Sequence, residues 1–142
     1  MGWMHDPGQG AAPLRVLVVD ADDRVCESLA GLLGIGERLV VVGGVGRPGP
    51  ALEMVTSAQP DVVVVDPRLP AIEDGLAFLK RLRAQAPGVR VVVLGSFDGP
   101  DQSALTAVGD AFVRKTFRPT ELVTAIEAAG RRPTETRPGA TL

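Results

Sequence analysis

The chain has few of the residues on which disulfide-bonded proteins and many hydrolases depend. It contains a single cysteine, Cys26, so neither an internal disulfide nor a cysteine-based zinc cluster can form within it. We predict that Cys26 is a small packing residue on a helix. The only histidine, His5, lies in the N-terminal tail, away from the segments expected to form the core. A hydrolase built on a Ser-His or Cys-His pair is therefore set aside.

Long apolar runs and concentrated charge are also absent from the sequence. No run approaches the about 20 residues that a membrane-spanning helix needs. Residues 1–13 lack the basic and apolar regions of a signal peptide, so we expect a cytoplasmic protein with no membrane partner. The net charge is −2 and the arginines are spread along the chain. We therefore expect no nucleic-acid binding by this domain, because such binding normally needs a basic stripe.

What the sequence does have is a series of short, valine-rich apolar runs. Most are uninterrupted rather than alternating, which is typical of strands buried on both faces of a parallel sheet. The runs are residues 16–19, 39–42, 62–65, 89–94 and 111–113.

Segments with helical spacing lie between these runs. Three carry a clear apolar stripe, formed by Val25, Leu29, Leu32 and Leu33, by Leu76, Leu79 and Leu82, and by Leu122, Val123 and Ile126. Residues 51–58 and 101–108 are weaker helix predictions. The alternation predicts an α/β fold, a (βα)5 doubly wound domain with a five-stranded parallel sheet covered by helices on both faces. We assign the domain to residues 14–130, with flexible tails at 1–13 and 131–142, the latter being a tail or the start of a linker.

Charged residues follow three of the predicted strands. Asp20 comes after the first, Asp66 after the third and Lys115 after the fifth. Ligands of open parallel sheets bind beyond the carboxyl ends of the strands, so these side chains would converge on one edge. Gathered carboxylates favour a hard cation such as Mg2+. One carboxylate could then attack a phosphoryl group, with the metal and the lysine neutralising charge on the transferred oxygens.

Each of these residues also has a plainer interpretation. Asp22 or Asp23 could cap the first helix, Asp66 could form a turn before a proline, and Lys115 could be a surface lysine. Taken singly, the plainer interpretation is the better one. Taken together at the ends of strands one, three and five, the residues favour a shared site.

Four segments carry a recognisable pattern, namely residues 16–20, 60–70, 91–94 and 109–115. Together they resemble the receiver domain of bacterial two-component response regulators. The resemblance extends over roughly residues 14–130. Its most specific parts are Asp66 with the following Leu69-Pro70 and the stretch from Gly109 to Lys115. It implies a flavodoxin-like fold with strand order 2-1-3-4-5 and a phosphoryl group donated to Asp66 by a histidine kinase. It implies no enzyme activity beyond self-phosphorylation and dephosphorylation.

The resemblance also assigns roles to individual residues. Asp66 is the expected phosphoacceptor, and Lys115 is expected to pair with the phosphoryl group. Asp20, Asp66 and the backbone carbonyl of Arg68 are expected to hold Mg2+. Phe112 falls where the family keeps an aromatic side chain that reports the phosphorylation state, although it could equally be a core aromatic.

The sequence departs from the family pattern in three places. Ala21 replaces an acid after Asp20, so Mg2+ binding is expected to be weak unless Asp22 or Asp23 reaches into the site. Gly95 replaces the serine or threonine at the end of the fourth strand, with Ser96 as the adjacent hydroxyl in the switch region. The loop from Pro70 to Gly75 is one residue longer than the usual turn.

The sequence leaves two alternative functions and two further partners to consider. The domain could be a pseudo-receiver, a protein-interaction module that works without phosphorylation. An electron carrier on the same topology is disfavoured, because the acidic loop after the first strand would repel a flavin phosphate. A homodimer could form through the fourth helix, fifth strand and fifth helix. A DNA-binding output domain for transcription regulation could lie outside this chain.

Overall fold

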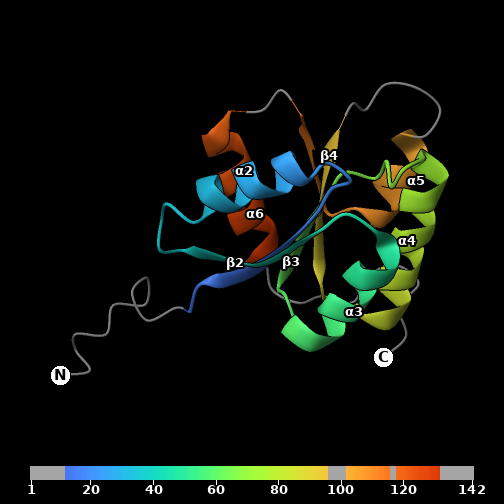
Figure 1. Cartoon of the computed structure of the whole chain (residues 1–142), viewed down its shortest axis with the longest axis horizontal. Helices are drawn as coiled ribbons and strands as arrows, with labels where there is room; N and C mark the ends of the chain where they lie inside the picture. The colour runs from blue at the N-terminus through green and yellow to red at the C-terminus, as the bar shows by residue number, and fades with distance from the viewer. Residues whose placement is uncertain (1–11, 96–101, 116–117, 132–142) are drawn as a thin grey trace.

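A computed structural model of the chain describes residues 12–95, 102–115 and 118–131. Strands and helices alternate along this part, as Figure 1 shows. The predicted tails 1–13 and 131–142 fall almost wholly outside the described residues and stay predictions. The strands are β1 (Leu14–Val19), β2 (Leu39–Val45), β3 (Val62–Val65), β4 (Arg90–Gly95) and β5 (Ala111–Arg114). The helices are α2 (Asp23–Leu33), α3 (Pro48–Ala58), α4 (Ile72–Gln85), α5 (Gln102–Val108) and α6 (Pro119–Gly130).

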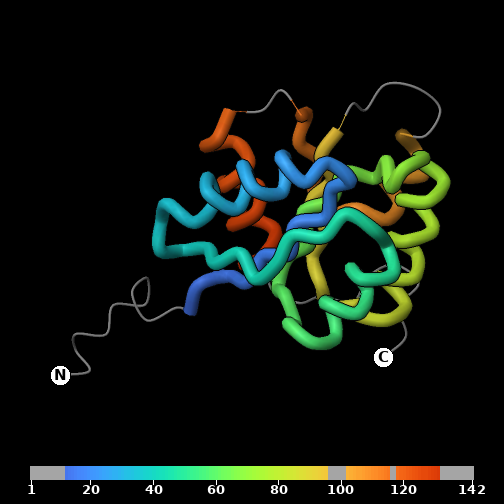
Figure 2. Tube along the Cα trace, in the orientation of Figure 1, coloured from blue at the N-terminus to red at the C-terminus, as the bar shows by residue number. Residues whose placement is uncertain are grey.

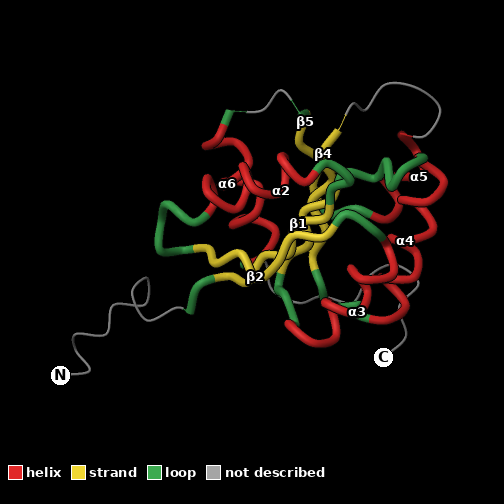
Figure 3. Tube along the Cα trace, in the orientation of Figure 1, coloured by secondary structure: helices red, strands yellow, loops and turns green. Residues whose placement is uncertain are grey.

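The five strands form one parallel sheet in the order β2-β1-β3-β4-β5. Helices α2 and α6 cover one face of this sheet, while α3, α4 and α5 cover the other (Figure 3). The doubly wound class predicted from the sequence and the strand order implied by the family resemblance are both confirmed. This is the arrangement that right-handed crossovers produce.

The central strand β3 explains the valine-rich pattern. All four of its residues, Val62–Val65, are fully buried. Both of its neighbours in the sheet, β1 and β4, are paired with it, and helices lie over both faces. A strand in this position has no polar face, which is why its apolar residues run without interruption.

Helix boundaries differ from the sequence predictions mainly at first turns. Helix α3 begins at Pro48, three residues before the predicted start at residue 51. Prolines are tolerated in a first turn because their missing N–H groups would have no partner there. Helix α4 begins at Ile72, so Gly75 lies inside its first turn rather than at the end of a loop. For α5 the first predicted residue, 101, lies outside the described residues.

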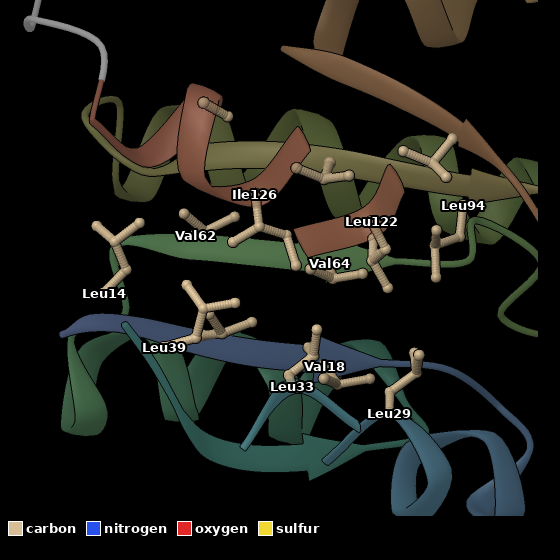
Figure 4. Packing of buried hydrophobic residues seen from close by; sticks show 14 of the residues in the cluster. Leu14, Val18, Leu29, Leu33, Leu39, Val62, Val64, Leu94, Leu122 and Ile126 are labelled. Atoms are coloured by element: carbon tan, nitrogen blue, oxygen red, sulfur yellow. The ribbon is translucent and has the colours of Figure 1, made fainter. Parts of the chain in front are cut away.

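Two apolar clusters form the core, one on each face of the sheet. In the first, α2 and α6 lie side by side although they are far apart in the sequence (Figure 2). Figure 4 shows their leucine and isoleucine side chains meeting Val18, Val62 and Val64 of the sheet. Burying a leucine or isoleucine in this way contributes about 1.5–3 kcal/mol. In the part of the chain that the structure describes, no helix is both long and apolar enough to cross a membrane.

Candidate functional site

Strand register places two carboxylates side by side at the carboxyl edge of the sheet. Val19 of β1 pairs with Val65 of β3. Asp20 and Asp66 are the next residues on these neighbouring strands, and the Asp66 N–H donates to the Val19 carbonyl at 3.0 Å. Backbone pairing between β1 and β3 thus brings together two residues that are far apart in the sequence, as predicted for this edge.

Lys115 reaches this pair from beyond the adjacent strand. It follows β5, which is separated from β3 by β4. Its Nζ donates to Asp66 Oδ2 at 2.5 Å and lies 3.0 Å from Asp20 Oδ2. The side chain therefore crosses the end of β4, which is Gly95. Among the described residues, a Cβ added at Gly95 would meet only Pro67 Cδ, at 3.9 Å, so there is room for a side chain at this position.

The two carboxylates are held by the same local hydrogen bond. Asp20 Oδ1 accepts from the Asp22 N–H and Asp66 Oδ1 accepts from the Arg68 N–H, both at 2.9 Å. This bond to the residue two positions ahead is an Asx turn, which fixes the side chain against its own backbone. As a result, both Oδ2 atoms face the Lys115 ammonium.

Because the two carboxylates are buried, their stability depends on the charge of Lys115. Asp20 is 3% exposed and Asp66 is 7% exposed, whereas the Lys115 side chain is 38% exposed. A buried carboxylate without a partner is costly, so the shared ammonium stabilises both acids. Burial alone lowers the pKa of Lys115, but hydrogen bonds and charge from Asp66 and Asp20 outweigh it. The net pKa is raised above the ordinary 10.5.

The donor set fits a hard divalent cation with few protein ligands. Asp20 Oδ2 is buried and makes no hydrogen bond in the described structure, although it lies in the ion pair with Lys115. Such an unbonded carboxylate oxygen is a suitable Mg2+ ligand. The described residues contain no group of three or more acidic, histidine or cysteine side chains that could hold a metal. Further ligands would be Asp66, a backbone carbonyl such as that of Arg68, and water.

The two other acids near Asp20 are placed differently. Asp22 is the N-cap of α2, and its side chain accepts from the Arg24 N–H at 2.9 Å. This confirms the capping interpretation for Asp22. Asp23 is exposed in the first turn of α2. Within the described residues, no hydrogen bond or ion pair joins either side chain to Asp66 or Lys115.

The expected switch residues lie on β4 and β5. Gly95 is buried at the last position of β4. Phe112 is half-buried in β5 and packs against the apolar cluster beneath α3, α4 and α5. Its role in reporting phosphorylation stays a prediction. Ser96 lies outside the described residues.

Sequence reasoning missed two contacts beneath the site. The buried Cys26 Sγ donates to the backbone carbonyl of Asp20 at 3.5 Å, so this packing residue lies against the backbone of the first acid. Burial and the charge of Asp20 raise the pKa of this thiol. Gly75 allows α4 to approach the Pro67 carbonyl so closely that no Cβ would fit. A glycine inside a helix was the available signal for this approach.

Comparisons with known proteins relate the chain to one family. The family model described as "Response regulator receiver domain" matches residues 16–127. Among curated proteins, a protein-glutamate methylesterase/protein-glutamine glutaminase of Anaeromyxobacter dehalogenans is 42% identical over 92 residues, covering 65% of this chain and 25% of that protein. The response regulator MprA of Mycolicibacterium vanbaalenii is 35% identical over 124 residues, covering 86% of this chain and 52% of that protein.

A solved structure shows the same likeness. The signal receiver domain of the response regulator NarL from Mycobacterium tuberculosis superposes with a TM-score of 0.75 at 28% identity. The match covers 86% of this chain and 100% of that domain. By contrast, the chain spans only a quarter to about half of the length of the two curated relatives.

Proposed function

Because the chain belongs to the receiver-domain family of two-component response regulators, we propose that Asp66 accepts a phosphoryl group from a histidine kinase. Receiver domains are generally phosphorylated by such kinases and generally bind Mg2+ at an acidic site. The observation that supports Asp66 as the acceptor is its position. It is the buried carboxylate at the end of β3 that pairs with Lys115 beside Asp20.

In the proposed reaction the Asp66 carboxylate is the nucleophile, and its two oxygens contact different groups of the site. One oxygen attacks the phosphorus of the phosphohistidine, the new P–O bond forms, and the P–N bond breaks with the imidazole leaving. The Arg68 N–H fixes the orientation of the carboxylate through Oδ1. The Lys115 ammonium lies at Oδ2 and is placed to neutralise charge on the transferred oxygens.

A bound Mg2+ would supply further neutralisation of the phosphoryl oxygens. Asp20 Oδ2, Asp66 and the Arg68 carbonyl are the groups that would hold it. Ala21 provides no carboxylate, and the Asp22 side chain is engaged in capping α2. Loss of a supporting group costs about 10- to 100-fold in metal affinity, so we expect an affinity for Mg2+ at least that much weaker than that of a site with an additional acid.

Phosphorylation would change the partners of the domain through the surface next to Lys115. A groove of about 760 Å³ lies between β5 and α6, and Phe112, Arg114 and Glu121 are among its lining residues. We place the homodimer or partner surface there, together with α5. An output domain for DNA binding, outside this chain, and a cytoplasmic location stay predictions.

The second candidate function is a receiver that binds partners without phosphorylation. Gly95 favours it, because this residue carries no hydroxyl to contact a phosphoryl group. Ala21 favours it as well, because the metal site loses an acid. The acid pair with its lysine is nevertheless complete, and for that reason phosphorylation is our primary proposal.

Incubation with acetyl phosphate and Mg2+, followed by intact-mass measurement, tests the proposal. We expect an added mass of one phosphoryl group in the wild type and none in Asp66→Ala. Glu27→Ala, which removes an exposed carboxylate from α2, is the matched control and should be phosphorylated normally. Lys115→Met should be phosphorylated more slowly. An unmodified wild type at saturating donor and Mg2+ would favour the phosphorylation-independent function instead.

A further inference from the structure

A hollow of about 640 Å³ opens between the loop after β1, the loop after β2 and the loop after β3. Its volume falls within the about 300–1,000 Å³ typical of ligand pockets. Arg47 is the one charged residue among the described residues that line it. The neutral lining residues include Ala21, Gly46, Leu69 and Pro70. Among these residues an anion would meet one positive charge and no negative one.

The hollow borders the acid pair of the candidate site. Ala21, which is exposed, directly follows Asp20, and Leu69 lies in the loop that follows Asp66. The loop after β2 packs against the first acid. A Cβ added at Gly46 would lie 3.4 Å from the Asp20 carbonyl oxygen and 3.7 Å from Ala21 Cα. The residue that follows Gly46 is therefore positioned next to the acidic site.

Ala21 determines the charge of this hollow. It stands where the sequence pattern of the receiver family has a second acid. An acid at this position would add a negative charge to the same hollow as Arg47, and the two opposite charges would attract each other. With alanine in its place, the positive charge of Arg47 is not neutralised from within the hollow.

The Arg47 side chain is not engaged elsewhere in the described structure. Arg47 is the N-cap of α3, a position that usually carries a residue whose side chain accepts from a first-turn N–H. Here Pro48 and Pro50 occupy the first turn and have no N–H, so fewer donors need a cap. Arg47 makes no such capping bond and is exposed. Among the described residues, its guanidinium has no hydrogen-bond or ion-pair partner.

Other cations at this edge are already paired or lie outside the hollow. Lys115 contacts both buried acids, and two carboxylates with one ammonium leave one net negative charge. Arg24 lies 3.7 Å from Asp22, and neither it nor the exposed Arg68 lines the hollow. A phosphate donor is itself an anion and is repelled by the net negative charge. A further cation is needed to offset this repulsion.

We propose that Arg47 is a substrate-binding residue, whose guanidinium contacts the non-reacting phosphoryl oxygens of a phosphate donor held in the hollow. The planar guanidinium can donate two parallel hydrogen bonds to a phosphate group. Its charge would offset part of the neutralisation that is lost with the weakened metal site. The role in phosphorylation rests on the proposed function of Asp66, whereas binding of an anion by Arg47 does not.

The kinetics of phosphorylation by acetyl phosphate at saturating Mg2+, followed by intact mass, test this role. An Asp66 oxygen forms the new P–O bond, and acetate leaves with the electrons of the broken bond. We expect Arg47→Gln to lower the second-order rate constant roughly 5- to 10-fold, because a charge-assisted contact is lost. Arg47→Lys should recover part of the rate, since it keeps the charge but not the planar fork. Equal rate constants for Arg47→Gln and wild type would overturn the proposal and leave Asp66 as the acceptor.

Arg24→Gln is the matched control. It removes the same charge from the same edge of the sheet, from a side chain that is 92% exposed and does not line the hollow. Its rate constant should remain close to that of the wild type. A loss as large as that of Arg47→Gln would mean that long-range charge, and not a contact in the hollow, accelerates the reaction, and would overturn the proposal.

Titration with inorganic phosphate in the absence of Mg2+ provides a readout that does not require phosphorylation. We expect saturable changes in the NMR amide shifts of Gly46 and Ala21 in the wild type and none in Arg47→Gln. Such Arg47-dependent shifts in a protein that acetyl phosphate does not modify would support the anion site and reject Asp66 as the acceptor. Shifts that are absent from the wild type, or equal in Arg47→Gln, would overturn the proposal.

Discussion

At the scale of single residues, Lys115 is the charge that makes two buried carboxylates compatible. We predict that Lys115→Met lowers the free energy of unfolding by about 1–3 kcal/mol, because it leaves Asp20 and Asp66 facing each other unpaired. The figure allows for the partial exposure of the lysine. Urea unfolding would measure the loss, and added Mg2+ should recover part of it, since the metal binds the folded state. A variant as stable as the wild type without Mg2+ would contradict this role.

The pH dependence of this contribution follows from the direction of the pKa shift. Because the folded-state pKa of Lys115 is raised, its contribution is fully present below the ordinary value of 10.5 and is lost as the pH rises through the higher folded value. The stability difference between wild type and Lys115→Met should therefore be constant from neutral to mildly alkaline pH. It should shrink only at strongly alkaline pH. If the stability difference between the two proteins disappeared near neutral pH, a group other than Lys115 would be responsible for it.

Cys26 gives a second prediction at this scale. Burial, followed by the charge of Asp20, raises the pKa of its thiol, so little thiolate is present at neutral pH. We expect a thiol-specific reagent to modify Cys26 far more slowly in the folded protein than in denaturant. The time course of the reaction, followed by the leaving group that the reagent releases, measures the rate of modification directly. Equal rates in the two conditions would mean that the thiol is accessible in the folded protein and that Cys26 is not buried against Asp20.

At the scale of elements, the close approach of α4 to the loop after β3 positions the acceptor. A Cβ at Gly75 would overlap the Pro67 carbonyl, next to Asp66. We predict that Gly75→Ala destabilises the fold by about 1–3 kcal/mol, because either α4 or the loop must move. It should also slow phosphorylation of Asp66 by acetyl phosphate, since the Arg68 N–H that orients the carboxylate lies in the same loop.

Gly31 provides the control for this substitution. It lies within α2, and a Cβ there would meet nothing within 4 Å. Gly31→Ala should raise stability by about 0.5–1 kcal/mol, because alanine is the better helix former. Phosphorylation should be unchanged. If both alanine variants behaved alike, the overlap at Pro67 would have no consequence for the site.

At the scale of the whole molecule, the sheet and its edge were predictable because they depend on local patterns and general topology. The valine runs identified the strands, and their lack of alternation indicated burial on both faces. Parallel strands present their carboxyl ends at one edge, so the proximity of Asp20 and Asp66 followed once both were placed directly after strands. The strand order itself came from the family resemblance.

Other features could not be read from the sequence because they depend on contacts across the fold. To predict that α3 starts at Pro48, one would need to know which backbone N–H groups have hydrogen-bond partners. Whether Asp22 capped a helix or entered the site depended on its rotamer. The approach of Gly75 to Pro67 arises where α4 packs against the loop after β3, a contact across the fold that no local pattern encodes.

The central claim is that Asp66 and Lys115 form one phosphoryl site at the carboxyl edge of the sheet. A crystal structure determined with Mg2+ and beryllofluoride, an analogue of the phosphoryl group, tests this most directly. We predict the analogue bound to an Asp66 oxygen, with the Lys115 ammonium contacting one of its fluorines. Asp66 without the analogue at saturating concentrations, or Lys115 directed away from it, would contradict the claim.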